Sequence, residues 1–426
     1  MGSHSKTSGM AKTSGMGRRT LLKAGAAVGA IQFASPFIIS ARGDEPIKIG
    51  VDNPLTGIYT ALGKNENTGM ELAASQINAK GGILGREIKL VVEDSTSDKT
   101  DVAVQKARKL IQSDNVNFLI GNVNSSHAIA IAQVAAELKT VHIVPGGHAD
   151  AVTGSSCHWT TFRICNTGAM QGNAMAGPLV KALGKKIYII AQDYAFGHAL
   201  HDGLAKAAAK AGGTIVGEEF FPLGTTDYSA VLIKARAANP DILVDLAAGD
   251  DGINSIKQAV QFGLDKQLHI AGMQQELEVI EGLPLEARIG TWMFEWYWKQ
   301  PNVPHVAEFV AAIRKVTNKV PTARTWFGYA SVWSLALAAN QAKTLDAVKV
   351  AHTLEGMKLP PEVALMPGAP FFRAEDHQLV PSVFVGHEQA KGIDDPEDLF
   401  VVDQVVNVAD VMPTPAETGC KLDFPA

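Results

Sequence analysis

Cysteine is scarce in this chain, and acidic side chains are absent from its first 43 residues. Three cysteines among 426 residues exclude a fold held together mainly by disulfides and leave an odd thiol. Residues 1–43 contain no Asp or Glu, and their basic residues are Lys6, Lys12, Arg18, Arg19, Lys23 and Arg42. Because the whole chain has a net charge of −5, the remainder is more acidic than that value. An acidic body argues against a nucleic-acid partner, which would need a basic face.

Long apolar runs and catalytic signatures are also missing. No stretch reaches the length of a membrane-spanning helix. The chain has no nucleophile elbow, phosphate-binding loop or dinucleotide-binding glycine fingerprint. His198 and His201 have H-x-x-H spacing, but no Cys or acidic residue accompanies them at zinc-ligand spacing. We therefore predict a protein that is not an enzyme, with no catalytic residue, no metal site and no cofactor.

The first 43 residues have the features of an export signal. The pair Arg18-Arg19 is followed by Leu21, Leu22 and Lys23, then by a weakly apolar stretch, 24–39, and small residues near Gly43. The arginine pair resembles a twin-arginine signal, the type that exports folded proteins. The alternative is a basic arm on a cytosolic protein. We expect the mature chain to begin near Asp44 and to be periplasmic.

After this segment the chain alternates between strands and helices. Short β-type runs at 47–51, 88–92, 116–120 and 141–144 are separated by helical spacing at 68–79, 102–111 and 128–138. Such alternation predicts parallel strands joined by crossover helices, which is a doubly wound α/β sheet. The same rhythm restarts after Arg163 and predicts a second lobe of the same kind. The apolar and aromatic stretch 289–298 then indicates a return toward the first lobe.

In open parallel sheets, ligands bind beyond the carboxyl ends of the strands. Two facing sheets would place these ends across one cleft. The candidate binding residues at these ends are Tyr59, Ser125, Ser126, His127, Gly146, Gly147 and His148 in the first lobe and Tyr194, Phe196, Asp250 and Gln274 in the second.

Two of these segments predict a site for an anion. Ser125 and Ser126 open a helix, whose first N–H groups and positive dipole end favour a carboxylate. Gly146 and Gly147 allow backbone amides to approach a ligand closely. The alternative is that the serines only cap the helix.

The second lobe offers flat apolar surface and an acidic pair. Tyr194 and Phe196 suit a ligand with an apolar body, although ordinary core packing would also explain them. Asp250 and Asp251 could receive a cationic group or could simply begin the next helix.

The cysteines leave three pairings open in an oxidising compartment. These are Cys157 with Cys165, Cys165 with Cys420, and Cys157 with Cys420.

Several motifs, in order along the chain, carry a family resemblance. They are Pro54-Leu55-Thr56-Gly57, the segment from Asn78 through Gly81-Gly82-Ile83-Leu84-Gly85-Arg86, Phe118–Gly121, Ser125, Ile143-Val144-Pro145 and Asp193-Tyr194-Ala195-Phe196-Gly197. The chain thus resembles the periplasmic substrate-binding proteins of ABC importers of the branched-chain-amino-acid (Leu/Ile/Val-binding-like) type, with the type I periplasmic-binding fold.

The resemblance implies two doubly wound parallel-sheet lobes that are joined by a three-crossing hinge and close on a small ligand. We place the signal region at 1–43, lobe I at 44–163 plus 299–366, and lobe II at 164–298 plus 367–426.

The resemblance also implies roles for individual residues. Ser125 and the residues after Pro145, namely Gly146, Gly147 and His148, would hold the ligand carboxylate, and Phe196 would pack on the ligand. In amino-acid receptors an acidic residue near the position of Gln274 holds the ligand ammonium. A neutral Gln does not compensate a buried ammonium, so an amino-acid ligand would need Asp250 instead.

We therefore expect a receptor for a small carboxylate, favoured to be an aromatic acid or a related apolar carboxylate. Tyr59, Tyr194, Phe196, Gln274 and the pair His127 and His148 suit such a ligand. The alternatives are a branched-chain amino acid, an amide or urea, a sensory ligand-binding protein, and an exported hydrolase on the same fold. The expected partner is the membrane permease of an ABC importer, and the expected state is a monomer.

Overall fold

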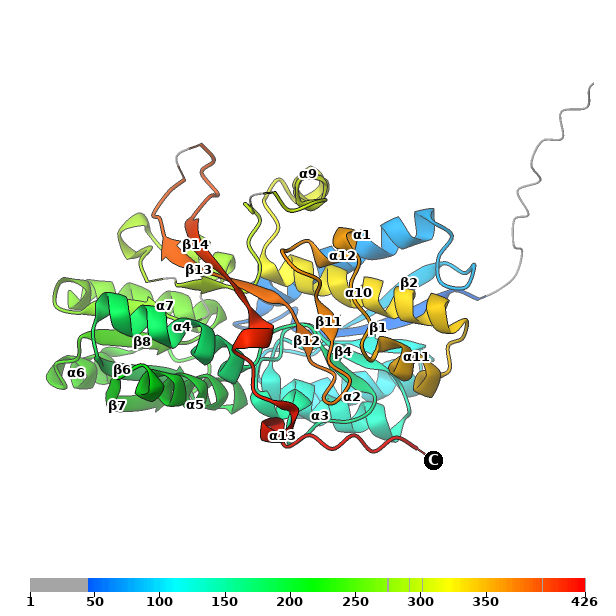
Figure 1. Ribbon diagram of the computed structural model, residues 1–426, viewed down its shortest axis with the longest axis horizontal. Helices are drawn as coiled ribbons and strands as arrows, with labels where there is room; N and C mark the ends of the chain where they lie inside the picture. Colours follow the sequence, from blue (N-terminus) through cyan, green and yellow to red (C-terminus); the bar gives the residue numbers. More distant parts are fainter. Residues whose placement is uncertain (1–44, 274–275, 291, 301, 393, 426) are drawn as a thin grey trace, which may run out of the picture. The chain divides into compact units, whose positions relative to one another are not determined.

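The structure of the chain is a computed structural model that describes residues 45–273, 276–290, 292–300, 302–392 and 394–425. The predicted export signal lies outside the described residues. Two parallel sheets dominate the fold, and helices flank both of them (Figure 1).

The first sheet has the strand order β2-β1-β3-β4-β5 and is parallel throughout. Its strands are β1 (Ile47–Asn53), β2 (Ile88–Asp94), β3 (Phe118–Ile120), β4 (His142–Val144) and β5 (Thr161–Arg163). The crossovers contain α1 (Thr60–Ala79), α2 (Thr100–Gln112) and α3 (Ser125–Glu137). Helices cover the sheet, so β1, β3 and β4 are buried almost throughout and rich in apolar residues, which made them predictable.

The second sheet has the order β7-β6-β8-β9 and is also parallel. It consists of β6 (Lys186–Gln192), β7 (Thr214–Phe221), β8 (Ile242–Leu246) and β9 (His269–Gly272). Its helices are α4 (Gly168–Leu183), α5 (Ala195–Lys210), α6 (Ser229–Ala237), α7 (Gly249–Gln261) and α8 (Leu277–Gly282). The predicted restart of the α/β rhythm after Arg163 is confirmed.

The remaining elements complete the first lobe and join the two. Helices α9 (Val306–Thr317), α10 (Ala323–Ala342), α11 (Ala347–Leu354) and α12 (Pro361–Ala364) and the hairpin of β11 (Phe371–Phe372) and β12 (Leu379–Val380) lie with the first sheet. An antiparallel sheet of β10 (Met293–Phe294), β13 (Ser382–Glu388) and β14 (Phe400–Asn407) contributes to both apolar cores. Below, lobe I means the first sheet with α1–α3, α9–α12 and the β11–β12 hairpin, and lobe II means the second sheet with α4–α8.

The chain passes between the lobes three times, as the fold requires. It leaves lobe I between β5 and α4, returns between β10 and α9, and leaves again between β12 and β13. The hairpin β11–β12 stays beside β5, where Gln378 forms a parallel bridge with Arg163 and Phe372 contacts Phe162. The lobe boundaries given from the sequence stay a prediction.

Two glycines bring α1 and α10 into close contact. A Cβ on Gly69 would lie 1.9 Å from the carbonyl oxygen of Thr325, and one on Gly328 would lie 1.9 Å from that of Glu66. Only glycine permits this approach of two helix backbones. The contact places Glu66 on α1 beside Arg324 on α10, and these two residues form an ion pair in the candidate site.

The helix α1 begins earlier than the sequence predicts. The expected start is Thr68, whereas the observed start is Thr60. Gly63 weakens the helical pattern in the extra turns. The missing side chain of Gly63 lets the helix lie against Pro54, whose carbonyl oxygen would be 2.2 Å from a Cβ there.

One of the three cysteine pairings is present. Cys157 and Cys420 form a disulfide, and Cys165 is a buried free thiol. Among the described residues, no helix is long and apolar enough to cross a membrane.

Candidate ligand-binding site

Side chains from lobe I and lobe II contact one another at the carboxyl ends of the strands. Tyr59 of lobe I is fully buried, and its hydroxyl donates to Oε1 of Gln192 in lobe II at 3.0 Å. The same hydroxyl lies 2.8 Å from that of Tyr194. These contacts hold the two lobes against each other at the end of β6.

An aromatic cluster continues from this contact. The rings of Tyr194 and Phe196 stack with centroids 5.8 Å apart, and Phe196 meets His148 edge to face at 5.9 Å. His148 also lies 6.3 Å from Phe327 of α10. Four of the residues predicted for the site, Tyr59, His148, Tyr194 and Phe196, are therefore in one continuous cluster drawn from both lobes.

A second cluster at the same interface is ionic. Nη1 of Arg324 lies 3.0 Å from Oε1 of Glu66 and donates to the carbonyl oxygen of Gly146 at 3.2 Å. Nε of Arg324 pairs with Oε1 of Glu276, which follows β9 in lobe II. All three charged side chains are buried, with Glu66 fully enclosed. Arg324 thus joins the two lobes through carboxylates on either side.

Burial and pairing shift the pKa values of this ionic cluster in opposite directions. Loss of water raises the pKa of Glu66 to about 7, although the charge of Arg324 works against the shift. Burial alone would lower the pKa of Arg324, but Glu276 and Glu66 keep it raised. Two carboxyl groups therefore share one permanent cation, and Glu66 is the member that can take up a proton near neutral pH.

A hinge network lies beside the aromatic cluster. Nε2 of His148 is 2.5 Å from Oε1 of Glu295, and the other oxygen of Glu295 accepts from the backbone N–H of Asn166 at 2.6 Å. Burial lowers the pKa of His148, and Glu295 opposes that shift. Asn166 and Glu295 lie on two different interlobe crossings, so His148 contacts the hinge directly.

The start of α3 differs in detail from the expectation. The cap is Asn124, whose Oδ1 accepts from the N–H groups of Ser126 at 2.8 Å and His127 at 3.2 Å. The side chain of Ser125 is buried and accepts from the N–H of Ala149 at 3.1 Å. The serines are thus not the caps, and two of the amides expected to bind an anion are already engaged by Asn124.

The two glycines after β4 are buried, but for a reason that the sequence did not reveal. A Cβ on Gly146 would lie 1.8 Å from Nη1 of Arg324, and one on Gly147 would lie 2.9 Å from the Cβ of Ala128. Gly146 makes room for a guanidinium. Any ligand group bound to the backbone here is therefore next to Arg324.

The remaining predicted residues are spread around the site. His127 is buried, and burial lowers its pKa to about 4, so its ring is neutral. Within the described chain, neither ring nitrogen has a hydrogen-bond partner. Asp250 is exposed, and its N–H donates to the carbonyl oxygen of Ile58 in lobe I at 3.2 Å. Gln274 lies outside the described residues.

Sequence reasoning missed the acidic and basic members of the site. Glu66, Arg324 and Glu276 come from three segments far apart in the chain. Arg324 did give a signal, since it is a single charge at the start of an otherwise apolar helix. Glu276 is two residues after Gln274 and was not among the predicted site residues. In the described ranges, no group of three or more His, Cys, Asp or Glu residues could hold a metal ion.

Two α/β lobes with buried side chains meeting between them define a bilobal ligand-binding protein. The chain belongs to the periplasmic binding protein family, whose pattern it matches over residues 46–392. The family resemblance and the fold inferred from the sequence are thereby confirmed.

Individual relatives agree with this assignment. The chain is 31% identical over 317 residues to Leu/Ile/Val-binding protein homolog 2 of Brucella abortus, covering 72% of this chain and 82% of that one. A periplasmic binding protein from Burkholderia mallei has a TM-score of 0.82 at 27% identity, over 89% of this chain and 99% of the other. A solute-binding protein of an ABC transporter from Rhodopseudomonas palustris, solved with 3,4-dihydroxybenzoic acid, has a TM-score of 0.77 at 22% identity. It covers 87% of this chain and 99% of its own, and it shares the fold.

Proposed function

We propose that this chain is the exported solute receptor of an ABC importer. It acts as a monomer, performs no chemistry and delivers its ligand to a membrane permease. Membership of the periplasmic binding protein family supports this role. The arginine pair and apolar stretch in residues 1–43 support export through a twin-arginine signal.

The favoured ligand is a small carboxylate with an apolar or aromatic body. The observation that carries this proposal is the cluster of Tyr59, His148, Tyr194 and Phe196, which both lobes build together. A flat ligand placed between these rings would gain stacking and would bury apolar surface. The backbone at Gly146 and Gly147 would receive the carboxylate, while the Arg324 guanidinium beside Gly146 is already paired with Glu66 and Glu276. The Rhodopseudomonas protein solved with 3,4-dihydroxybenzoic acid shows that this fold can accept such a ligand.

A branched-chain amino acid is the second candidate, and the ionic cluster is the observation that favours it. Glu66 and Glu276 place two carboxyl groups against one guanidinium, so the cluster has an excess of negative charge when both are ionised. A ligand ammonium would neutralise that excess. The Brucella relative, named as a Leu/Ile/Val-binding protein homolog, is consistent with this candidate.

A thermal-shift panel on the protein beginning at Asp44 separates the two candidates. The panel contains benzoate, 4-hydroxybenzoate, leucine, urea and 4-methyl-2-oxopentanoate, which is leucine with a keto group in place of the ammonium. A ligand at about 100 times its Kd stabilises the folded state by about 2.7 kcal/mol, which raises the Tm measurably. We expect a shift with the benzoates and none with leucine.

The Tm shifts of leucine and of its keto analogue test whether the site recognises the ligand ammonium. A shift with leucine but not with its keto analogue would establish an ammonium subsite and replace the aromatic-acid proposal. Glu276→Gln should then abolish the leucine shift. No shift with any carboxylate would contradict both candidates.

A further inference from the structure

The C-terminal residues 413–425 link lobe II to lobe I in addition to the three crossings. We call this segment the C-terminal strap. The chain reaches it from β14 through the short helix η4 (Val408–Asp410), and it contains α13 (Pro415–Thr418). In Figure 1 the strap is the red segment that runs from η4 through α13 and ends beside lobe I.

The residues just before the strap are fixed to lobe II. Val408 is fully buried in the same apolar core as Met170 and Leu204. The carbonyl oxygen of Val411 accepts from Nδ2 of Asn173 on α4 at 2.7 Å. Met412 packs against the same core. This end therefore moves with lobe II.

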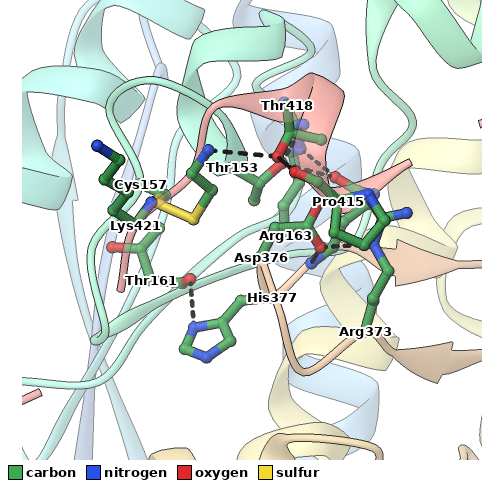
Figure 2. Close-up of a disulfide and its surroundings, with 12 residues drawn as sticks. Thr153, Cys157, Thr161, Arg163, Arg373, Asp376, His377, Pro415, Thr418 and Lys421 are labelled. Atoms are coloured by element: carbon green, nitrogen blue, oxygen red, sulfur yellow. Dashed lines mark hydrogen bonds and ion pairs between the residues drawn. A yellow bond between two sulfur atoms is a disulfide. The ribbon is translucent and has the colours of Figure 1, made fainter. Parts of the chain in front are cut away.

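The strap itself is fixed to lobe I. Cys420 is bonded to Cys157, which follows the short helix η1 (Asp150–Thr153), and the N–H of Lys421 lies 3.1 Å from the sulfur of Cys157 (Figure 2). Beyond the disulfide, the ring of Phe424 stacks on His352 of α11 with centroids 4.2 Å apart. It also lies 5.6 Å from Trp159. This end moves with lobe I.

The base of the strap also contacts the β11–β12 hairpin of lobe I. Nη1 of Arg373 donates to the carbonyl oxygen of Pro413 at 2.8 Å, and the same guanidinium is paired with Asp376 (Figure 2). The change from lobe II contacts to lobe I contacts therefore takes place between Met412 and Pro413. Residues up to Met412 are bound to lobe II, and residues from Pro413 onward are bound to lobe I.

A cavity lies beneath this junction. It has a volume of about 470 Å³, and its walls come from lobe I at Asp150, from lobe II at Asn173, Lys206 and Lys210, and from the strap at Glu417. The cavity therefore lies where lobe I, lobe II and the strap meet, beside the contact in which the N–H of Ala169 on α4 donates to Oδ1 of Asp150 at 3.2 Å.

We propose that the C-terminal strap is a fourth link between the lobes that resists their opening when ligand leaves. Opening at this edge draws Met412 away from Cys420, and the disulfide prevents the far end from yielding. The seven residues between them include the single turn of α13. Pro413 is itself held by Arg373 of lobe I, so further separation must first break this hydrogen bond. The tension then falls on the turn of α13, which lengthens when it unwinds, because a helix rises about 1.5 Å per residue and an extended chain about 3.3 Å. The effect on ligand release rests on the proposed function, whereas the effect on lobe separation does not.

The test measures the distance between the lobes in the ligand-free protein. Fluorophores are attached through p-acetylphenylalanine introduced at Lys139 in lobe I and Ala237 in lobe II, which are both exposed. This chemistry leaves all cysteines untouched. Single-molecule energy transfer then reports the distribution of lobe separations in the parent and in the Cys157→Ser, Cys420→Ser double variant.

A second variant keeps the disulfide and lengthens the strap. Four residues, Gly-Ser-Gly-Ser, are inserted between Thr414 and Pro415. The stabilising cross-link remains, so a disulfide that only supports the local fold of lobe I would leave the lobe distances unchanged. The matched control carries the same insertion between Leu422 and Asp423, beyond the disulfide, where it does not lengthen the chain between Met412 and Cys420.

We expect the double serine variant and the insertion between Thr414 and Pro415 to shift the distances toward wider separations, and the insertion between Leu422 and Asp423 to match the parent. Parent distances in both strap variants would overturn the proposal. So would a shift in the serine variant alone, since this would assign the effect to lobe I stability. With a ligand from the thermal panel, dissociation should be about three- to tenfold faster in both strap variants. If no ligand is found, the proposed function fails while the distance result stands.

Discussion

Two clusters join the lobes, and they differ in the kind of interaction: one is aromatic and the other is ionic. The aromatic cluster of Tyr59, Tyr194, Phe196 and His148 joins the lobes through ring contacts and one hydroxyl pair. The ionic cluster of Glu66, Arg324 and Glu276 joins them through fully desolvated charges. Rings tolerate small changes in separation, whereas a buried charge that loses its partner is costly. The ionic cluster should therefore decide whether the lobes stay together, and the aromatic cluster should decide what they enclose.

Replacing the cation should give the largest effect. In Arg324→Met, Glu66 and Glu276 remain buried without their common partner, so the free energy of unfolding should fall by about 3–5 kcal/mol. Urea unfolding at pH 7.5 measures the change.

A triple variant, Glu66→Gln, Arg324→Met, Glu276→Gln, serves as its control. Removal of all three charges should recover most of the loss, because no unpaired charge remains. If Arg324→Met loses less than about 1 kcal/mol, the ionic cluster does not hold the lobes together as described.

The pH dependence of Glu66 should give the next largest effect. Its pKa is raised from 4.5 to about 7 by burial, so the folded state binds the proton more tightly than the unfolded state. The resulting stability is fully present below pH 4.5 and is lost as the pH rises through about 7. Glu66→Gln should therefore remove about 3 kcal/mol of the change in the free energy of unfolding between pH 4.5 and 8 relative to the parent.

Urea unfolding at several pH values measures this difference. Subtracting the two profiles removes the contributions of Asp245 and Glu278, whose pKa values are also raised to about 7. Parallel profiles would show that Glu66 does not change its protonation in this range.

Removing one hydroxyl from the aromatic cluster should give a smaller change. Tyr59→Phe eliminates the bonds to Gln192 and Tyr194, at a cost of about 1 kcal/mol. Oε1 of Gln192 keeps its contact with the N–H of Ala248 at 3.3 Å, so this acceptor still has a donor. Calorimetry measures the stability. A loss as large as that of Arg324→Met would reverse the ranking of the two clusters.

Asp250→Asn should give the smallest effect. The side chain is exposed and belongs to neither cluster, so the stability should change by less than about 0.5 kcal/mol. The Tm shift produced by any ligand of the panel should also be unchanged. A lost leucine shift in this variant would restore Asp250 as the partner of a ligand ammonium.

The difference between the clusters also explains what the sequence could predict. Tyr194 and Phe196 follow one strand directly, and Tyr59 follows another, so the rule that ligands bind at strand ends found them. Arg324 lies in a helix that reaches the site only because Gly69 and Gly328 allow α1 and α10 to touch. That approach depends on backbone packing between segments about 250 residues apart, which no local pattern encodes. Apolar strand runs predicted both sheets except β5 (Thr161–Arg163), in which only Phe162 is apolar, so it gives no such run.

The Cys157–Cys420 bond has a consequence for how the protein is made. Its partners are 263 residues apart, whereas Cys165 is close to Cys157 in sequence. In an unfolded chain, closure of the short loop is favoured over closure of the long one. An oxidant that met the chain before folding would therefore join Cys157 to Cys165. Once the chain has folded, Cys165 is buried and burial raises its thiol pKa, so it is unreactive. Export in the folded state would thus present the oxidising compartment with the two cysteines that belong together.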